Sequence, residues 1–258
     1  MATFPENFTL LHQGEEFIRA RSLEAIHASD SMPHHFELIA DSMDLIEYFA
    51  RHFAHTSENQ LLIQHLGIRL FNGSASAVQL MLSGYYQTAV LQQRDLLEVV
   101  FLLDYFQTNR AMIAEWKTCD EGTRNKRFGA FHVRKALDDR DGFTERKREA
   151  HYKLLCSLGG HASFQGLRML RPIDGSDAHC GPFFAEPSLV ATVEELTTIM
   201  VQAALVFTRF FDAKSRVDFA PKLTFMEKQG IWFERFFGRP FDRQPLEEMR
   251  AIMAQLKS

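Results

Sequence analysis

The segment LLEVVFLLDYF, residues 96–106, is apolar or aromatic at every position except Glu98 and Asp104. A helix formed by such a run is apolar on all sides, so neighbouring helices must cover it on all sides. Most of the remaining chain repeats its apolar residues at helical spacing, and few segments show the period-two alternation of Val, Ile or Thr that strands require. The sequence therefore predicts an all-α protein, a multi-helix bundle with residues 85–108 as its central helix.

The other helices follow from the same periodicity and from cap and breaker residues. Pro33 suits a first helical position, Thr56 or Ser57 can cap a helix, and Gly84 is expected to end one. Besides the central helix we expect helices at 8–28, 34–54, 58–83, 109–116, 124–138, 144–158, 188–211, 219–238 and 245–256.

A long loop interrupts this pattern between the expected helices 144–158 and 188–211. Residues 159–187 contain five glycines and three prolines, and a loop of this length is usually functional or disordered. It is the one plausible divider, after which residues 188–258 can form a subdomain. We expect one helical domain over residues 1–258.

Composition limits the class of protein. Of the 258 residues 46% are hydrophobic and 24 are Phe, which is enough for a sizeable core, and the net charge of −4 gives no bulk attraction to nucleic acid or anionic lipid. The first residues lack the features of a signal peptide, and no run reaches about 18 uncharged apolar residues. Three widely spaced cysteines, an odd number, favour a reducing compartment. We expect a cytoplasmic protein with no membrane contact.

Charge is unevenly distributed along the chain. Residues 1–60 carry ten acidic and three basic residues, whereas residues 124–153 carry ten basic and five acidic residues. The two segments can attract each other within the fold or across a homodimer, or each can be a solvated helix face. We expect a homodimer.

A polar pair stands where the central helix becomes apolar. Arg94 and Glu98 share a helix face with Phe101 and Tyr105. Buried charges must be paired and hydrogen-bonded, because desolvation costs several kcal/mol per ion. The base-before-acid order contributes little on an exposed helix. The pair is therefore either an internal brace between helices or part of a site for a small anionic or polar ligand, since Arg offers a planar fork of donors.

Ser157 and His161 are the expected partners of this pair. Gly159 and Gly160 suit the end of the helix at 144–158, so His161 lies where the chain enters the loop and can face a cleft beside the central helix. Histidine titrates near neutral pH and can shuttle a proton. A Ser–His nucleophile is conceivable, although the chain has no G-x-S-x-G motif. The predicted ligand-binding residues are Arg94, Glu98, Tyr105, Ser157 and His161.

The spacings A-x-x-x-x-R-x-x-x-E, at Ala89, Arg94 and Glu98, and S-x-x-x-H, at Ser157 and His161, carry a resemblance. Over residues 85–165 the chain resembles a group of bacterial helical domains of unknown function. Some of these are considered akin to HEPN domains, helical bundles found in ribonucleases of toxins and phage defence. The resemblance implies a helical fold and a polar cleft, without an established reaction.

HEPN ribonucleases cut RNA without metal through an R-x4–6-H motif, in which Arg neutralises phosphate charge and His transfers a proton. Arg146 with His151, and Arg127 with His132, have this spacing within the basic stretch. The polar residue that usually follows the Arg is absent, because Lys147 and Phe128 stand there. The resemblance makes a metal-independent endoribonuclease with Arg146 and His151 as catalytic residues the alternative function, and RNA a possible partner.

Two further clusters are interpreted as structural. The His, Asp and Glu residues of segment 34–55 lack the spacing of a carboxylate–histidine metal site, and only Glu24 and His27 match an E-x-x-H pattern. The aromatic and basic segment 222–237 is typical of a core or subunit interface. No Walker loop, dinucleotide fingerprint or zinc ligand set is present. We expect no metal and no cofactor, with an interaction protein braced by Arg94 and Glu98 as the third functional alternative.

Overall fold

The computed structural model describes residues 5–173 and 175–255. Position 174 of the predicted loop and position 256 of the last predicted helix lie outside these ranges. Throughout the described ranges the regular elements are helices, with no strand. The all-α multi-helix bundle predicted from the periodicity is confirmed.

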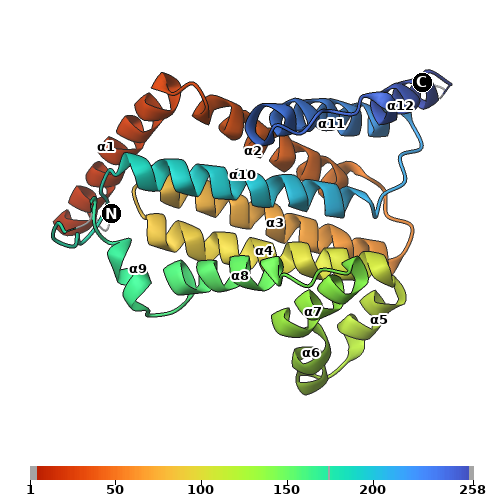
Figure 1. Cartoon of the computed structure of the whole chain (residues 1–258), viewed down its shortest axis with the longest axis horizontal. Coiled ribbons are helices and arrows are strands. Elements are labelled where there is room, and N and C mark those ends of the chain that lie inside the picture. The colour runs from red at the N-terminus through yellow and green to blue at the C-terminus, as the bar shows by residue number, and fades with distance from the viewer. Residues whose placement is uncertain (1–4, 174, 256–258) are drawn as a thin grey trace.

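The centre of the bundle is formed by α2 (Met32–Glu47), α3 (Glu58–Leu82), α4 (Tyr86–Thr108) and α10 (Glu186–Thr208). These helices run side by side along the long axis of the molecule (Figure 1), and α4 packs on both α3 and α10. As expected for a helix that is apolar on all sides, α4 buries residues on several faces, among them Leu96, Leu97, Val100 and Leu103.

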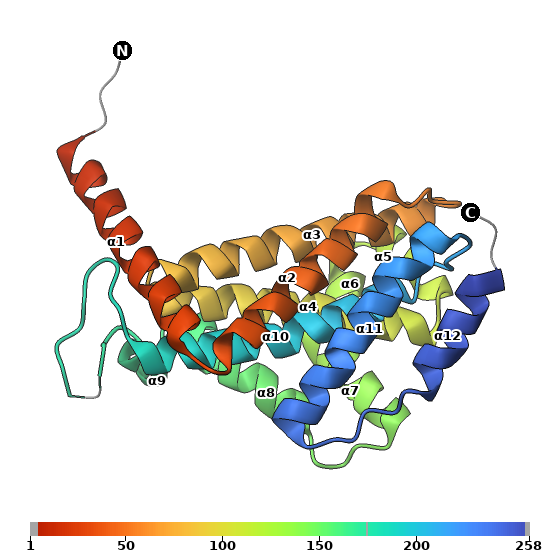
Figure 2. The same cartoon turned by 90° about the horizontal axis from the view of Figure 1, so that it is seen from above.

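The remaining helices cover this centre. α1 (Glu6–Ala28) extends from one end of the bundle, whereas α11 (Arg216–Phe237) packs on α2 and carries α12 (Gln244–Gln255), as Figure 2 shows. A short π-helix, η1 (Tyr48–His52), continues α2. Ser57 caps α3 by accepting from the Gln60 N–H, and Ser215 forms a capping box with Asp218 at the start of α11.

Gly84 marks the tight connection from α3 to α4. Its φ is +82°, and a Cβ there would lie 2.2 Å from the carbonyl oxygen of Phe183. Only glycine tolerates both the left-handed conformation and this approach of the chain that precedes α10. The break predicted at Gly84 thus also fixes the entry of α10.

A group of shorter helices projects from the side of α4: α5 (Ala111–Thr118), α6 (Glu121–Phe128) and α7 (Ala130–Asp141). Residues 124–138, expected to form one helix, belong to two. The chain turns at Gly129, where a Cβ would lie 2.4 Å from the carbonyl oxygen of Asn125. Gly129 is the poorest helix former of this stretch, and the close backbone contact with Asn125 fixes the break there.

α8 (Lys147–Leu155) runs along α4 and ends in a π-helical turn, η2 (Cys156–Gly160). The loop that follows includes the short helix α9 (Phe164–Arg168). By length and composition α10 is apolar enough to cross a membrane, but 56% of its most apolar window is buried inside the protein. Its position between α2 and α4 accounts for that apolar character.

The acidic and basic segments do not pair with each other within the described ranges. α1 lies at one end of the bundle and α6 and α7 project elsewhere (Figure 1). Basic residues of 124–153 pair with nearby acids instead, such as Arg140 with Asp104 at 2.9 Å and Arg148 with Asp138 at 2.7 Å. Contact between these segments across a homodimer stays a prediction.

Candidate functional site

The Arg94–Glu98 pair lies on the face of α4 that α8 covers. The Arg94 Nη2 and Glu98 Oε1 atoms are 3.4 Å apart, and the two side chains are 22% and 31% exposed. Both groups are therefore partly buried rather than surrounded by bulk water. Each needs polar partners inside the protein.

Tyr152, from α8, is the third member of this cluster. Its hydroxyl donates to Glu98 Oε1 and lies 3.4 Å from Arg94 Nη1, which donates to it. Burial, reinforced by the hydrogen bond to Glu98, raises the pKa of Tyr152, so the hydroxyl keeps its proton at neutral pH. Sequence spacing gave no signal for Tyr152, because it lies on another helix.

The glycines of η2 allow α8 to approach α4 this closely. A Cβ on Gly159 would lie 2.7 Å from the Leu91 backbone nitrogen, and one on Gly160 would lie 3.1 Å from Arg94 Cδ. Gly159 and Gly160, expected only to end a helix, thus form part of the α4–α8 contact. Any side chain at position 159 would force the two helices apart.

Arg134, from α7, contacts the ring of Tyr152. Its guanidinium carbon lies 4.0 Å from the ring centre, a cation–π geometry. Arg134 is only 6% exposed, and its Nε and Nη1 atoms are buried without a hydrogen-bond partner. A buried cation with unsatisfied donors is costly, so this residue is a candidate for contact with a ligand. The sequence alone did not distinguish Arg134 from the other basic residues of 124–153.

α7 separates two cavities. Ala130 and Val133 line a cavity of about 220 Å³, which we call the Glu98 cavity; its other walls come from Leu66, Arg69, Asp95, Glu98, Val99, Phe101, Leu102, Trp116 and Phe128. Arg134 lines a different cavity of about 440 Å³, which we call the α7–α8 cleft; it is shared with Phe131, Lys135, Asp138, Asp139, Phe143, Thr144, Arg146 and Glu149.

Within the described residues, no hydrogen bond or ion pair joins Tyr105, Ser157 or His161 to Arg94 or Glu98. Tyr105 lies about 16 Å further along α4, at a rise of about 1.5 Å per residue, and its ring packs edge-on against Phe128. His161 is exposed just after η2. The Ser157 hydroxyl donates to the Leu154 carbonyl at 2.8 Å, and no hydrogen bond joins Ser157 to His161 within the described residues.

In each of the two R-x4–6-H pairs, the Arg and the His contact different residues. Arg146 has a side chain that is 80% exposed and lies 3.8 Å from Glu149, while His151 Nε2 lies 2.5 Å from Glu195 Oε1 on α10. The hydrogen bond to Glu195 raises the pKa of His151, although burial acts in the opposite direction. Arg127 pairs with Glu115, and the exposed His132 packs against its neighbour Phe131. RNA cleavage through Arg146 and His151 stays a prediction.

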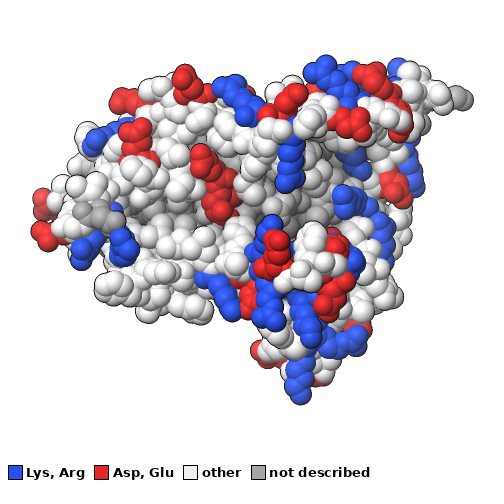
Figure 3. Space-filling view, viewed as in Figure 1, with Lys and Arg blue, Asp and Glu red and all other residues white. Residues whose placement is uncertain are grey.

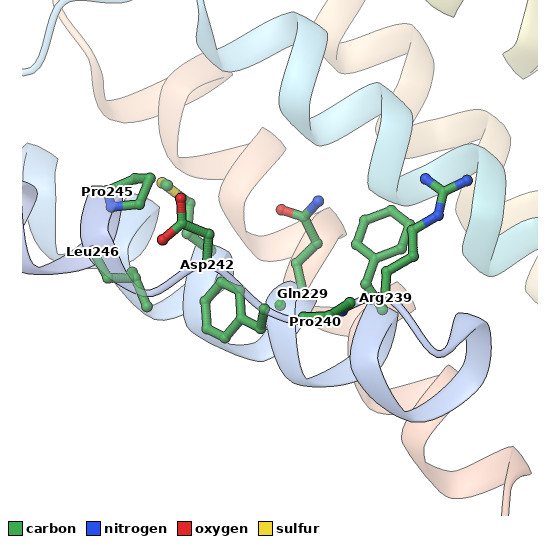
Figure 4. Close-up of a pocket in the computed structure, with 10 residues that line it drawn as sticks. Gln229, Arg239, Pro240, Asp242, Pro245 and Leu246 are labelled. Atoms are coloured by element: carbon green, nitrogen blue, oxygen red, sulfur yellow. The ribbon is translucent and has the colours of Figure 1, made fainter.

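A further cavity of about 280 Å³ lies between α11 and the segment that leads to α12. Figure 4 shows its lining, with Arg239 and Asp242 well apart. Phe241 folds over Gly230, where a Cβ would lie 2.1 Å from the ring. None of its charged lining residues is buried. In residues 5–173 and 175–255 no three His, Cys, Asp or Glu side chains form a group that could hold a metal ion.

The fold and this cluster define an all-helical bundle in which a tyrosine joins an ion pair on the central helix to a buried arginine. No family model matches the chain, and neither a curated protein nor a solved structure matches it.

Proposed function

We propose that this chain is a ligand-binding protein whose polar ligand occupies the Glu98 cavity. The observation that carries the proposal is the position of Glu98 at the polar side of an otherwise largely apolar cavity. Apolar walls with a few placed polar groups are the usual composition of small-molecule sites.

The carboxylate of Glu98 has an acceptor to spare. Its Oε1 accepts a hydrogen bond from Tyr152 and forms the ion pair with Arg94, whereas its Oε2 accepts no hydrogen bond within the described part of the chain. Because Arg94 and Tyr152 hold the other oxygen, Glu98 is fixed in place before a ligand arrives. Such preorganisation reduces the cost of binding.

The charge of the lining selects the ligand. Glu98 and Asp95 supply two carboxylates and Arg69 supplies one cation, which already pairs with Asp95 at 2.6 Å. Carboxylates repel anions and accept N–H donors. We therefore propose a ligand with an apolar body and an amine or amide donor. Of the two ligand classes expected from the Arg94–Glu98 pattern, anionic or polar, this is the polar one.

The test compares two probes of similar size and opposite charge, 2-phenylethylamine and 3-phenylpropionate. The unfolding temperature of the whole chain should rise when the amine is added and should not change with the acid. Glu98→Gln should abolish the amine effect, and Ala130→Phe, which fills the cavity, should do the same. Glu24→Gln removes an exposed carboxylate on α1 and serves as the control. Equal stabilisation by both probes, or an unchanged effect in Glu98→Gln, would contradict the proposal.

We also propose that the protein works in a reducing cytoplasm. Cys119, Cys156 and Cys180 are all unpaired, and the first two are at least partly buried. Free thiols persist in reducing compartments. Fractionation of cells, with thiol labelling of the recovered protein, tests this; recovery in an oxidised form from a secreted fraction would contradict it.

A further inference from the structure

The α7–α8 cleft is richer in charge than the Glu98 cavity, with three basic and three acidic residues in its lining. Figure 3 shows Lys and Arg side chains gathered, together with acidic ones, over the part of the molecule where α7 and α8 lie. Three of these basic residues, Arg134, Lys135 and Arg146, line the cleft.

Arg134 is the most unusual of the three because it is nearly fully buried. The ring of Tyr152 covers its guanidinium, but a ring replaces neither a carboxylate nor a hydrogen-bond acceptor. Two of its nitrogens have no acceptor. A native structure rarely leaves buried donors unpaired, so an unsatisfied group of this kind indicates a missing partner.

The acids of the cleft do not supply that partner. Asp138 pairs with Arg148 at 2.7 Å, and Glu149 pairs with Lys153 at 2.5 Å and with Arg146 at 3.8 Å. Glu149 also attracts Arg134 electrostatically, but it accepts no hydrogen bond from the Arg134 Nε or Nη1. Lys135, like Arg134, forms no ion pair in the described ranges. The exposed Asp139 is the remaining carboxylate of the lining. Within the described ranges, Arg134 and Lys135 thus have no ion-pair partner, and Asp139 is the acid of the lining that is not in an ion pair.

Aromatic side chains complete the lining. Phe131 is 59% exposed and Phe143 is 56% exposed, although both are large apolar residues. Arg148 stacks on the ring of Phe143, with its guanidinium carbon 5.0 Å from the ring centre, which helps to hold that ring in place. The cleft thus combines cations with exposed aromatic faces.

We propose that the α7–α8 cleft binds the phosphate group of an aryl phosphate monoester. The phosphate oxygens would accept from the guanidinium of Arg134 and the ammonium of Lys135, and the aryl group would lie against Phe143, the ring on which Arg148 stacks. A planar guanidinium matches two phosphate oxygens at once, and a dianion suits two unpaired cations better than a carboxylate does. This site lies on the opposite side of α7 from the Glu98 cavity and does not depend on the function proposed there.

The experiment is calorimetric titration of the full chain with phenyl phosphate, inorganic phosphate and benzoate. We expect phenyl phosphate to bind more tightly than inorganic phosphate, and benzoate to bind more weakly than phenyl phosphate. Arg134→Met should weaken phenyl phosphate binding about tenfold or more, as the loss of a charge-assisted hydrogen bond implies. Lys126→Met removes one exposed charge from α6 outside the cleft and should leave binding unchanged.

Three further measurements keep the outcomes distinct. Arg134→Met should unfold at no lower urea concentration than the wild type, because it removes a buried cation whose Nε and Nη1 have no hydrogen-bond acceptor, and this offsets the lost contact with the Tyr152 ring. Phe143→Ala should weaken phenyl phosphate but not inorganic phosphate. Ala130→Phe, which fills the Glu98 cavity, should leave phosphate binding intact, so failure at one site is separable from failure at the other. Undetectable phosphate binding, or equal losses in Arg134→Met and Lys126→Met, would overturn the proposal.

Discussion

The guanidinium of Arg134 lies over the ring of Tyr152, 4.0 Å from its centre, while the hydroxyl of the same tyrosine donates to Glu98. One side chain of α8 thus contacts a charged group from α7 and another from α4. The ring of Tyr152 contacts Arg134 and its hydroxyl contacts Glu98, so substitutions can remove one contact without the other.

Tyr152→Phe keeps the ring and removes the hydroxyl. We expect a loss of about 1–3 kcal/mol in the free energy of unfolding, because Glu98 Oε1 loses a donor in a partly buried position. Tyr152→Leu, which also removes the contact with Arg134, should lose more. Urea unfolding measures both variants. A Tyr152→Phe protein as stable as the wild type would show that water replaces the hydroxyl.

The Arg94–Glu98 pair should behave as a coupled unit. Arg94→Met and Glu98→Leu each leave one partly buried charge without its partner, whereas the double variant leaves neither. We expect each single variant to be destabilised by about 1–2 kcal/mol and the double variant to lose less than the sum of the two. A double-mutant cycle of unfolding free energies measures the coupling. Strict additivity would mean that the pair contributes no mutual stabilisation.

Gly159→Ala should be strongly destabilising, by about 2 kcal/mol or more, because overpacking of a tight backbone contact forces helices to shift. The added Cβ would lie 2.7 Å from the Leu91 nitrogen and 2.8 Å from the Gln87 carbonyl oxygen. The matched control is Gly142→Ala, at a position with φ +66° and open space around it. There we expect only the cost of the left-handed conformation, about 1 kcal/mol. Similar losses in the two variants would count against the tight α4–α8 contact.

His35 should make the protein less stable in mild acid. Its Nδ1 accepts the Trp232 Nε1–H at 3.0 Å, the residue is 4% exposed, and burial lowers its pKa to about 4, with His34 and Arg235 acting in the same direction. Its neutral form is favoured in the folded protein, so its contribution is complete above pH 6.5 and is lost between about pH 6.5 and 4. The loss should reach about 3 kcal/mol.

Urea unfolding across this pH range measures the effect, and His35→Leu should flatten the dependence. His151 does not interfere, because its pKa is raised: its contribution is complete below pH 6.5 and is lost only as the pH rises through its folded value. A slope that survives in His35→Leu would assign the acid sensitivity to other groups.

Local sequence predicted most of the helices and the Arg94–Glu98 pair, which lies within a single helix. The apolar run 96–106 required a covered helix, and α4 is central. Arg94 and Glu98 lie one turn apart, so helical geometry alone placed them together. The same geometry put Tyr105 on their face, but its distance along the axis keeps it out of the cluster.

Tertiary structure decided what the pair contacts. Tyr152 reaches the pair from α8 and Arg134 reaches the Tyr152 ring from α7. Their approach depends on the turn at Gly129 and on the close packing of Gly159 against α4. Periodicity records which face of a helix is buried, whereas the partner that buries it is set by how whole helices pack. For that reason the sequence identified a polar pair without its tyrosine, and left the buried cation of Arg134 as one of many basic residues.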